Sequence, residues 1–254
     1  MNIIEACRVY DVNSPKLRIG KLNDGGYVIN ELIEANTTKL ISVGMGNEDS
    51  FEVDWFSRYP NTQIEAYDGT YPCQQLCCKY PEMVNKRIFY TNTDVGYAVD
   101  TCSGNTDQSR IALNAIVDGK PNVLLKVDVE GAEYNIFDNI RLSNVTGLIL
   151  EVHDLHLVKN QVKLVELMET SFADLALFHV HGNAWGNTFT LNLSGTGINS
   201  LPVKDFPIVM EMCFINRNLA GPIALATNTF PVAGMDSPNN PEAPDIDLYW
   251  VNTL

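Results

Sequence analysis

Short apolar segments recur along the chain, and each is followed by glycine or polar residues. A continuous apolar run bounded by turn residues is typical of a strand that is covered on both faces, as in a parallel sheet. Between these runs, segments 50–59 and 155–172 carry apolar residues at helical spacing and predict amphipathic helices. Alternating strands and helices indicate an α/β domain. We expect strands at residues 40–43, 63–67, 87–91, 123–127, 146–154, 175–183 and 207–215.

The strongest single signal is segment 122–133, in which a buried strand runs directly into acidic residues. In open α/β sheets, ligands bind beyond the carboxyl ends of the strands, which is where Asp128 and Glu130 would lie. Gly131 gives the backbone freedom to turn, and residues 132–140 predict the start of a helix. One carboxylate in this position could simply cap that helix. Several acids in so short a stretch favour a functional site.

A second signal is a glycine turn after the strand at 40–43. Gly44 and Gly46 precede a predicted helix, and strand, glycine turn and helix form the beginning of a nucleotide-binding fold. Asp68 ends the next strand, where a carboxylate would accept hydrogen bonds from ribose hydroxyls. The third glycine of the dinucleotide pattern is absent, so a plain turn and a loop aspartate remain the alternative. Three polar residues after the following strand would lie near the base or sugar of a nucleotide: Asn92, Thr93 and Asp94.

Two strand ends carry histidine. Glu151 and His153 share one face of a strand because side chains alternate along it, whereas His179 points to the face opposite His181. Neutral imidazole is suited to removing a proton near neutral pH, so we expect His153 first, and His181 second, as a base. The alternative is that each histidine is a structural residue whose hydrogen bonds are satisfied at the end of its strand. Together with Asp128, the side chains of Glu151, His153 and His181 offer the oxygen and nitrogen donors of a divalent-cation site. Their spacing in the sequence matches no known metal-ligand motif.

Both ends of the chain predict extended structure. The Asn23–Gly26 turn between two alternating segments predicts a hairpin over residues 18–29. The alternative is a flap over a ligand, with Tyr27 or Lys21 in contact. Proline cannot continue a helix, so the proline-rich tail beyond Phe230 should pack as an extended arm.

Composition narrows the possible functions. The chain has 254 residues and is 45% hydrophobic, enough for a sizeable core. Its formal net charge is −14, from 17 basic and 31 acidic residues, and such a surface repels nucleic acid. The first thirty residues lack the apolar segment of a secretory signal, and no window is long enough to span a bilayer. The six cysteines lack the paired spacing of a zinc site. We expect reduced thiols and a cytoplasmic protein with no membrane partner.

These segments together resemble the FkbM-type S-adenosylmethionine-dependent methyltransferases, which are class I methyltransferases. The resemblance rests on Ile41–Gly46, on Asp68, and above all on Leu125–Glu133 followed by Leu150–His153. It covers roughly residues 18–217. The run Lys-x-Asp-x-Glu-Gly-x-Glu is its most specific part.

The resemblance implies a Rossmann-like class I methyltransferase fold, with a seven-stranded, mostly parallel sheet and helices on both faces. It implies an N-terminal arm and hairpin (1–38), a methyltransferase domain (39–217) and an extended C-terminal tail packing on that domain (218–254). One departure is the absence of glycine at Phe137–Asn139, where many relatives have one in the helix. We expect this departure to affect packing more than chemistry.

The resemblance also implies S-adenosylmethionine as the cofactor. An alcohol is a poor nucleophile, so a hydroxyl acceptor benefits from a base that removes its proton as the methyl group moves in line. The implied cofactor residues are Gly44, Met45 and Gly46 under the methionine part, Asp68 at the ribose, Asn92, Thr93 and Asp94 near the adenine, and Asp128 beside the sulfonium.

We therefore expect an O-methyltransferase acting on a hydroxyl of a small metabolite or glycan, with Asp128, Glu151, His153 and His181 as catalytic candidates. A metal-assisted O-methyltransferase is one alternative, and a non-catalytic binding protein that keeps the fold is another. An NAD-linked enzyme is disfavoured by the missing third glycine. The oligomeric state does not follow from the sequence.

Overall fold

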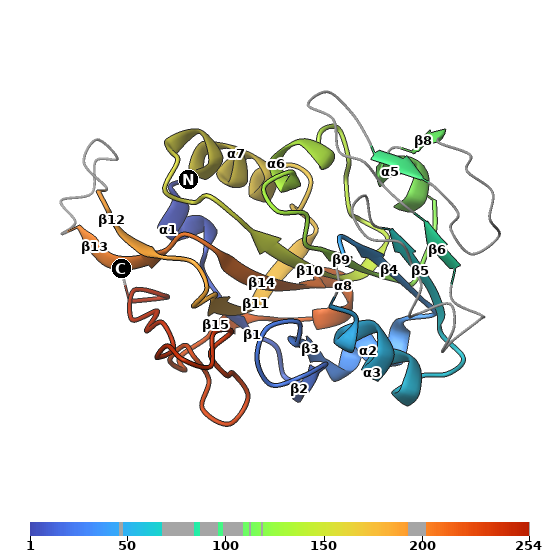
Figure 1. Ribbon diagram of the computed structural model, residues 1–254, viewed down its shortest axis with the longest axis horizontal. Helices are drawn as coiled ribbons and strands as arrows, with labels where there is room; N and C mark the ends of the chain where they lie inside the picture. The colour runs from blue at the N-terminus through green and yellow to red at the C-terminus, as the bar shows by residue number, and fades with distance from the viewer. Residues whose placement is uncertain are drawn as a thin grey trace.

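The centre of the molecule is a mixed β-sheet (Figure 1). This computed structural model describes residues 1–45, 48–67, 84–86, 96–98, 109–111, 113–117, 119–192 and 202–253. The inner pairs β4–β9, β9–β10 and β4–β5 are parallel, whereas β14 is antiparallel to both β10 and β11. Across the sheet the order is β11 (Leu175–Gly182), β14 (Met210–Asn216), β10 (Val145–Val152), β9 (Val123–Val127), β4 (Lys39–Val43), β5 (Gln63–Tyr67) and β6 (Val84–Lys86).

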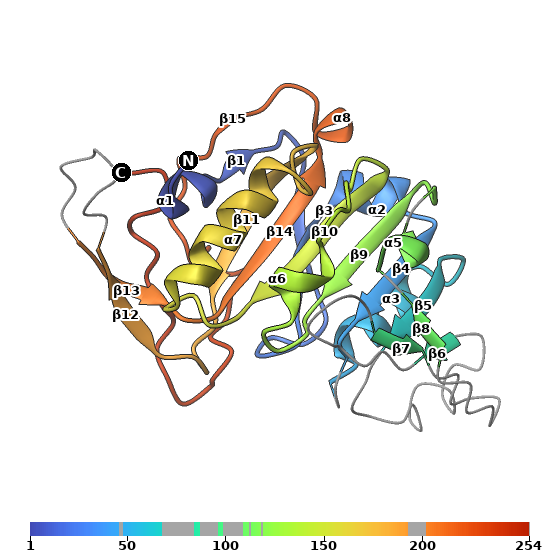
Figure 2. The same ribbon diagram turned by 90° about the horizontal axis from the view of Figure 1, so that it is seen from above.

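Helices cover both faces of this sheet (Figures 1 and 2). One face carries α1 (Ile3–Ala6), α5 (Leu113–Val117), α6 (Glu133–Ile136) and α7 (Val158–Glu169). The other carries α2 (Glu31–Asn36), α3 (Ser50–Arg58) and α8 (Arg217–Ala220). Strand alternation divides the core between them, because Ile41 and Val43 pack on the first face and Leu40 packs on the second. The expected α/β fold is confirmed, and its central sheet is mixed.

Three further strand pairs complete the described structure besides the hairpin. Strand β1 (Tyr10–Asp11) pairs with β15 (Ala224–Leu225), and β12 (Thr188–Leu191) pairs with β13 (Val203–Pro207). Strand β7 (Gly96–Ala98) pairs with β8 (Ser109–Ile111). The strand expected at 87–91 lies outside the described residues, so the complete seven-stranded class I topology stays a prediction.

The predicted N-terminal hairpin is present as β2 (Lys16–Ile19) and β3 (Tyr27–Asn30). It does not project from the molecule as a free flap, because every residue of β3 is buried. Its side chains join the core on the face of α2 and α3. The hairpin therefore belongs to the layer that packs on the α2 and α3 face of the sheet.

The C-terminal tail packs along the sheet edge formed by β11 and ends beside the N-terminal segment. The Asn252 side chain donates to the Val9 carbonyl oxygen at 2.8 Å and accepts from the Val9 amide at 3.0 Å. Leu248 and Trp250 are buried, and the Trp250 ring stacks on Phe206. The tail thus contributes to the hydrophobic core.

One helix prediction was wrong in extent. The helix expected over residues 132–140 is the single turn α6, which ends at Ile136, and the left-handed φ of 59° at Asn139 further along prevents a longer helix. None of the helices in the described ranges has the length and apolar character needed to cross a bilayer. Cys7 and Cys213 are buried free thiols.

Candidate functional site

The site lies where the chain order of the sheet reverses, between β4 and β9. Strands β5 and β6 continue to one side of β4, and β10 lies on the far side of β9. Such a switch point leaves a crevice at the carboxyl ends of the strands. Gly44 follows β4 and Asp128 follows β9, and they meet there. Gly44 has a left-handed φ of 78°, and a Cβ on it would lie 1.5 Å from the Asp128 carbonyl oxygen. Only glycine permits this approach.

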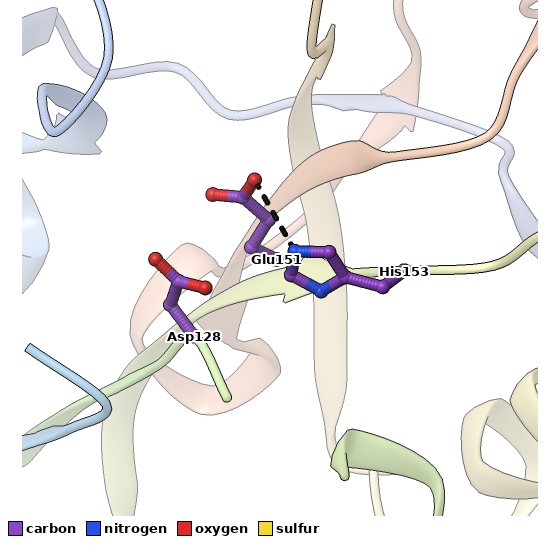
Figure 3. A group of neighbouring side chains, drawn as sticks. All are labelled: Asp128, Glu151 and His153. Carbon is purple, nitrogen blue, oxygen red and sulfur yellow. Dashed lines mark ion pairs between the residues drawn. The ribbon is translucent and has the colours of Figure 1, made fainter. Parts of the chain in front are cut away.

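Three side chains gather beyond these strands (Figure 3). Asp128 follows β9, Glu151 lies near the end of β10, and His153 follows that strand. One potential ligand atom from each lies within 4.8 Å of those of the other two. All three line a cavity of about 400 Å³. Of the four catalytic candidates expected from the sequence, the structure thus brings Asp128, Glu151 and His153 together.

Tyr27 of the hairpin reaches under the two carboxylates. Its hydroxyl oxygen lies 3.1 Å from Glu151 Oε2 and 3.2 Å from Asp128 Oδ2. The other Glu151 oxygen accepts from the Asn183 side-chain amide at 2.7 Å. Glu151 is only 4% exposed and is held on both sides. Asp128 Oδ1 is buried and has no hydrogen-bond partner among the described residues.

His153 is held by a second carboxylate behind it. Its Nδ1 lies 2.5 Å from Oε1 of Glu133, a residue that is 1% exposed. Its backbone carbonyl accepts a hydrogen bond from Tyr134. The ring therefore has a fixed orientation, with Nε2 directed to Glu151 Oε1 at 3.8 Å and to the exposed Glu130 at 3.3 Å.

A buried lysine lies next to this cluster but pairs elsewhere. Lys126 Nζ is 3.5 Å from Glu52 Oε1 and 3.5 Å from the Gly44 carbonyl oxygen, and it lies over the Tyr27 ring. Glu52 also accepts from the Ser42 hydroxyl at 2.5 Å. In the described part of the chain, neither Asp128 nor Glu151 forms an ion pair with lysine or arginine. His153 is the cation within 4 Å of Glu151.

Burial and like charge dominate the electrostatics of the cluster. Burial raises the pKa of Asp128 to about 6, although Lys126 and His153 oppose this shift. Burial and the charge of Asp128 raise the pKa of Glu151 well above its usual range. Burial alone would lower the pKa of His153, but the hydrogen bond to Glu133 and the surrounding carboxylates raise it to about 9. The site is therefore short of positive charge and suits a cationic ligand.

The outer wall of the cavity combines acidic groups with one exposed indole. Trp185 is 61% exposed and lines the cavity together with Asp24. Its backbone amide donates to Asn183 Oδ1 at 2.8 Å, while the amide group of the same side chain donates to Glu151. Asn183 thus fixes the position of the loop that carries Trp185 relative to the carboxylate.

His181 does not line this cavity. Its Nδ1 lies 3.2 Å from Glu211 Oε2, and its Nε2 lies 2.8 Å from Asp245 Oδ1 of the tail. Burial lowers its pKa, but these two carboxylates outweigh burial and raise the pKa to about 10. His181 is fully buried and anchors the tail, and it lies apart from the cluster of Asp128, Glu151 and His153. His179, on the opposite face, pairs with Asp236 of the tail at 2.8 Å.

The expected cofactor residues are described only in part. Gly44 forms the turn, and the Met45 side chain is buried in the core. Five expected positions lie outside the described residues: Gly46, Asp68, Asn92, Thr93 and Asp94. Their contacts with a cofactor stay predictions.

A family model described as the methyltransferase FkbM domain matches residues 7–183 of the chain. The protein belongs to the FkbM methyltransferase family. The match begins before the hairpin that carries Tyr27 and ends at Asn183, so it includes every residue placed in the cluster above. Methyl transfer is accordingly the general reaction of the domain to which this site belongs.

Beyond the family match, this FkbM methyltransferase shows only weak similarity to a solved structure. A crystal structure of precorrin-6y C5,15-methyltransferase from Geobacter metallireducens is similar at 10% identity and a TM-score of 0.36, covering 73% of this chain and 86% of that chain. A likeness at that score carries no argument about the site. No curated protein sequence matches the chain.

Sequence reasoning missed several residues of the FkbM methyltransferase site. Tyr27 was named only as a possible flap contact, and the roles of Glu133, Asn183 and Trp185 were not foreseen. Glu133 stands within the acidic run, so that run was the available signal for it. No pattern in the sequence marks Trp185, because its position depends on a turn fixed by Asn183.

Proposed function

We propose that this protein transfers the methyl group of S-adenosylmethionine to a hydroxyl group of a small metabolite or glycan. The observation that carries the proposal is the position of the cluster of Asp128, Glu151 and His153. It lies at the carboxyl end of the sheet, on a cavity next to the Gly44 turn. Membership of the family supports methyl transfer, and the cluster supports an acceptor that must lose a proton.

The chemistry of a hydroxyl acceptor fits these side chains. A hydroxyl is a weak nucleophile, and its proton must leave as the oxygen attacks the methyl carbon. Carboxylate oxygens accept a hydrogen bond from that hydroxyl and promote loss of its proton, and His153, whose pKa is raised to about 9, balances part of their charge. Fixing both reactants in line supplies a large part of the rate. The hydrogen bonds of Tyr27 and Asn183 to Glu151 provide the required rigidity.

The same side chains fit the charge of the cofactor. S-adenosylmethionine carries a positive sulfonium, and the cluster is short of positive charge. Asp128 adjoins the turn at Gly44 through its backbone carbonyl, and its Oδ1 is buried with no hydrogen-bond partner among the described residues. Bound at this turn, the cofactor supplies an electrophilic methyl group, and the carboxylates attract its positively charged sulfonium.

Trp185 supports an acceptor of modest size with an apolar face. A largely exposed indole at the mouth of a cavity offers a flat surface for a sugar or other ring. The acidic groups around it, Asp24 and Glu130, accept hydrogen bonds from hydroxyls and repel phosphate. This arrangement favours neutral polyhydroxy compounds over polyanions such as nucleic acid.

Two measurements test the proposal. Calorimetry should show one S-adenosylmethionine bound per chain, and incubation of labelled cofactor with a panel of glycosides and hydroxylated metabolites should give a product methylated on oxygen. His153→Ala should keep cofactor binding and lose turnover, whereas His156→Ala, a change at an exposed histidine in the same loop, should keep both. Absence of cofactor binding, or a product methylated on nitrogen or carbon, would refute the proposal. Cofactor binding without turnover on any acceptor would favour a non-catalytic relative.

A further inference from the structure

We propose that Asp128, Glu151 and His153 bind a divalent cation of the Mg²⁺ or Mn²⁺ class, and that this ion holds an acceptor with two neighbouring oxygen atoms, such as a vicinal diol. The inference deepens the proposed methyl transfer to a hydroxyl and rests on it for the identity of the reaction. The ion site itself rests on the geometry of the three side chains.

The donor atoms lie near the spacing that such an ion requires, although the 4.8 Å within which they fall slightly exceeds it. Ligand atoms about 2.1–2.2 Å from an octahedral ion lie about 3 to 4.4 Å from one another. Here the three atoms lie within 4.8 Å of one another, and His153 Nε2 is 3.8 Å from Glu151 Oε1. Two carboxylates and one imidazole favour Mn²⁺ over Ca²⁺ because one donor is nitrogen.

The groups behind the three side chains are those expected of a metal site. A ligating histidine usually donates its other ring N–H to a carboxylate, which fixes the tautomer and orients the free nitrogen. Glu133 occupies that position at His153 Nδ1, 2.5 Å away, and leaves Nε2 directed into the cluster. Asn183 and Tyr27 fix Glu151 in the same way.

A buried oxygen without a partner points independently to a missing ligand. Asp128 Oδ1 is inaccessible to solvent and has no hydrogen-bond partner among the described residues. An unpaired buried carboxylate oxygen is costly. The neighbouring ammonium of Lys126 does not supply the partner, because it pairs with Glu52. A cation between Asp128, Glu151 and His153 would occupy that oxygen.

Three protein ligands leave open positions on an ion that prefers six. Two adjacent open positions match two neighbouring oxygens of a diol, which defines the substrate class. A hydroxyl that binds the ion is more acidic than a free one. Its proton passes to the exposed Glu130 carboxylate and then to water. The oxygen electron pair forms the bond to the methyl carbon, and the pair of the breaking carbon–sulfur bond stays on sulfur, which gives neutral S-adenosylhomocysteine.

The test is a titration of the full-length, EDTA-treated protein with Mn²⁺, followed by electron paramagnetic resonance, with and without S-adenosylmethionine. We expect one Mn²⁺ per chain, displaced by Mg²⁺. Glu151→Gln and His153→Ala should each weaken Mn²⁺ binding at least tenfold, and Glu133→Gln about tenfold because it acts through His153. The matched control His156→Ala should leave binding unchanged. Circular dichroism verifies that each variant is folded, and Asp128→Asn replaces any that is not.

The outcomes separate this inference from the proposed function. Cofactor binding and methylation that persist in EDTA, with no stoichiometric Mn²⁺ binding, would overturn the ion site and leave methyl transfer intact. Stoichiometric Mn²⁺ binding that is lost in the cluster variants, in a protein that binds no S-adenosylmethionine, would support the ion site and refute the methyltransferase. Mn²⁺ binding that is equal in wild type, Glu151→Gln and His153→Ala would also overturn the ion site.

Discussion

Replacing Asp245 with asparagine should loosen the C-terminal tail in a pH-dependent way. Asp245 Oδ1 lies 2.8 Å from His181 Nε2, and Glu211 of β14 lies 3.2 Å from the other ring nitrogen. Asparagine keeps the size of the side chain and an oxygen that still accepts from the Ile246 amide, as Asp245 does at 3.1 Å. The substitution therefore removes mainly the charge that faces the imidazolium.

The pKa of His181 sets the size of the effect. The charges of Asp245 and Glu211, with Asp236 further off, outweigh burial and raise this pKa from 6.5 to about 10. Because one pKa unit corresponds to about 1.4 kcal/mol, this net rise corresponds to roughly 4–5 kcal/mol of pH-linked stabilisation. If two contacting carboxylates share it, Asp245→Asn should lower the free energy of unfolding by about 2 kcal/mol at pH 7. That value agrees with about 1.5–3 kcal/mol for a hydrogen bond to a charged group.

The direction of the pH dependence follows from the raised pKa. A histidine whose pKa is higher in the folded state stabilises fully below its unfolded value of about 6.5. That stabilisation is lost as pH rises through the folded value of about 10. The difference in unfolding free energy between wild type and Asp245→Asn, measured by urea denaturation, should therefore be largest near pH 6–7 and shrink towards pH 10.

Asp247→Asn provides the matched control, since Asp247 is exposed in the same tail segment and forms no ion pair with a described residue. It should leave unfolding unchanged within about 0.5 kcal/mol. A wild type–Asp245→Asn difference that stays constant from pH 6 to pH 10, or grows with pH, would refute the assignment of a buried imidazolium to His181.

Three further substitutions test the site directly. Gly44→Ala should destabilise the protein and abolish S-adenosylmethionine binding in calorimetry, because its Cβ would lie 1.5 Å from the Asp128 carbonyl oxygen. Gly119→Ala shares the left-handed φ but meets nothing within 4 Å, so it should cost only about 1–2 kcal/mol and keep binding; equal behaviour of the two variants would contradict the close-approach argument. Tyr27→Phe should lower the unfolding free energy by about 1–3 kcal/mol in urea, because it leaves two buried carboxylates short of a donor, and no loss would argue against that bridge. Trp185→Ala should raise the KM for the acceptor and leave cofactor affinity unchanged, and an unchanged KM would remove the indole from acceptor binding.

The sheet was the part of the fold most accessible from sequence. Strands β5 and β9 occupy the predicted residues, and β4 and β10 differ from prediction at their ends only. Strands β9 and β10 are buried at every residue and β4 at all but its first, so their sequences are mainly apolar between turn residues, whereas β5 alternates apolar and polar residues. Apolar residues indicate that a segment is buried, and a short buried segment between turn residues indicates an inner strand.

Helices were less accessible because their ends depend on local conformation. Helix α6 ends at Ile136, and Asn139 further along adopts the left-handed conformation, which asparagine tolerates but which residue type alone does not fix. In α7, Val158 and Val162 are largely exposed although their spacing suggested a core face. Apolar residues at helical spacing define a face, but the neighbouring layer determines how far along the helix that face is covered.

The candidate site was predictable where it depended on strands and not where it depended on packing between distant segments. Asp128, Glu151 and His153 each end a strand, and parallel strands bring their carboxyl ends together. Tyr27 lies 124 residues before Glu151, and their hydrogen bond depends on how the hairpin packs against the sheet. His181 resembled a site residue by the same strand-end rule, yet β11 lies at the sheet edge, where the tail covers it.

The hydrogen bond of Tyr27 bears on how the chain is divided. An N-terminal arm and hairpin over residues 1–38, followed by a separate catalytic domain, remains a prediction about folding units. The functional site does not follow that division, because it includes a residue of the hairpin. The hydroxyl of Tyr27 lies between the Asp128 and Glu151 carboxylates, and no other described side chain bridges them. A segment starting at residue 39 would contain both carboxylates but would lack this donor and the buried strand β3. The hairpin is therefore a structural component of the site, and its removal should weaken the site even if the sheet still forms.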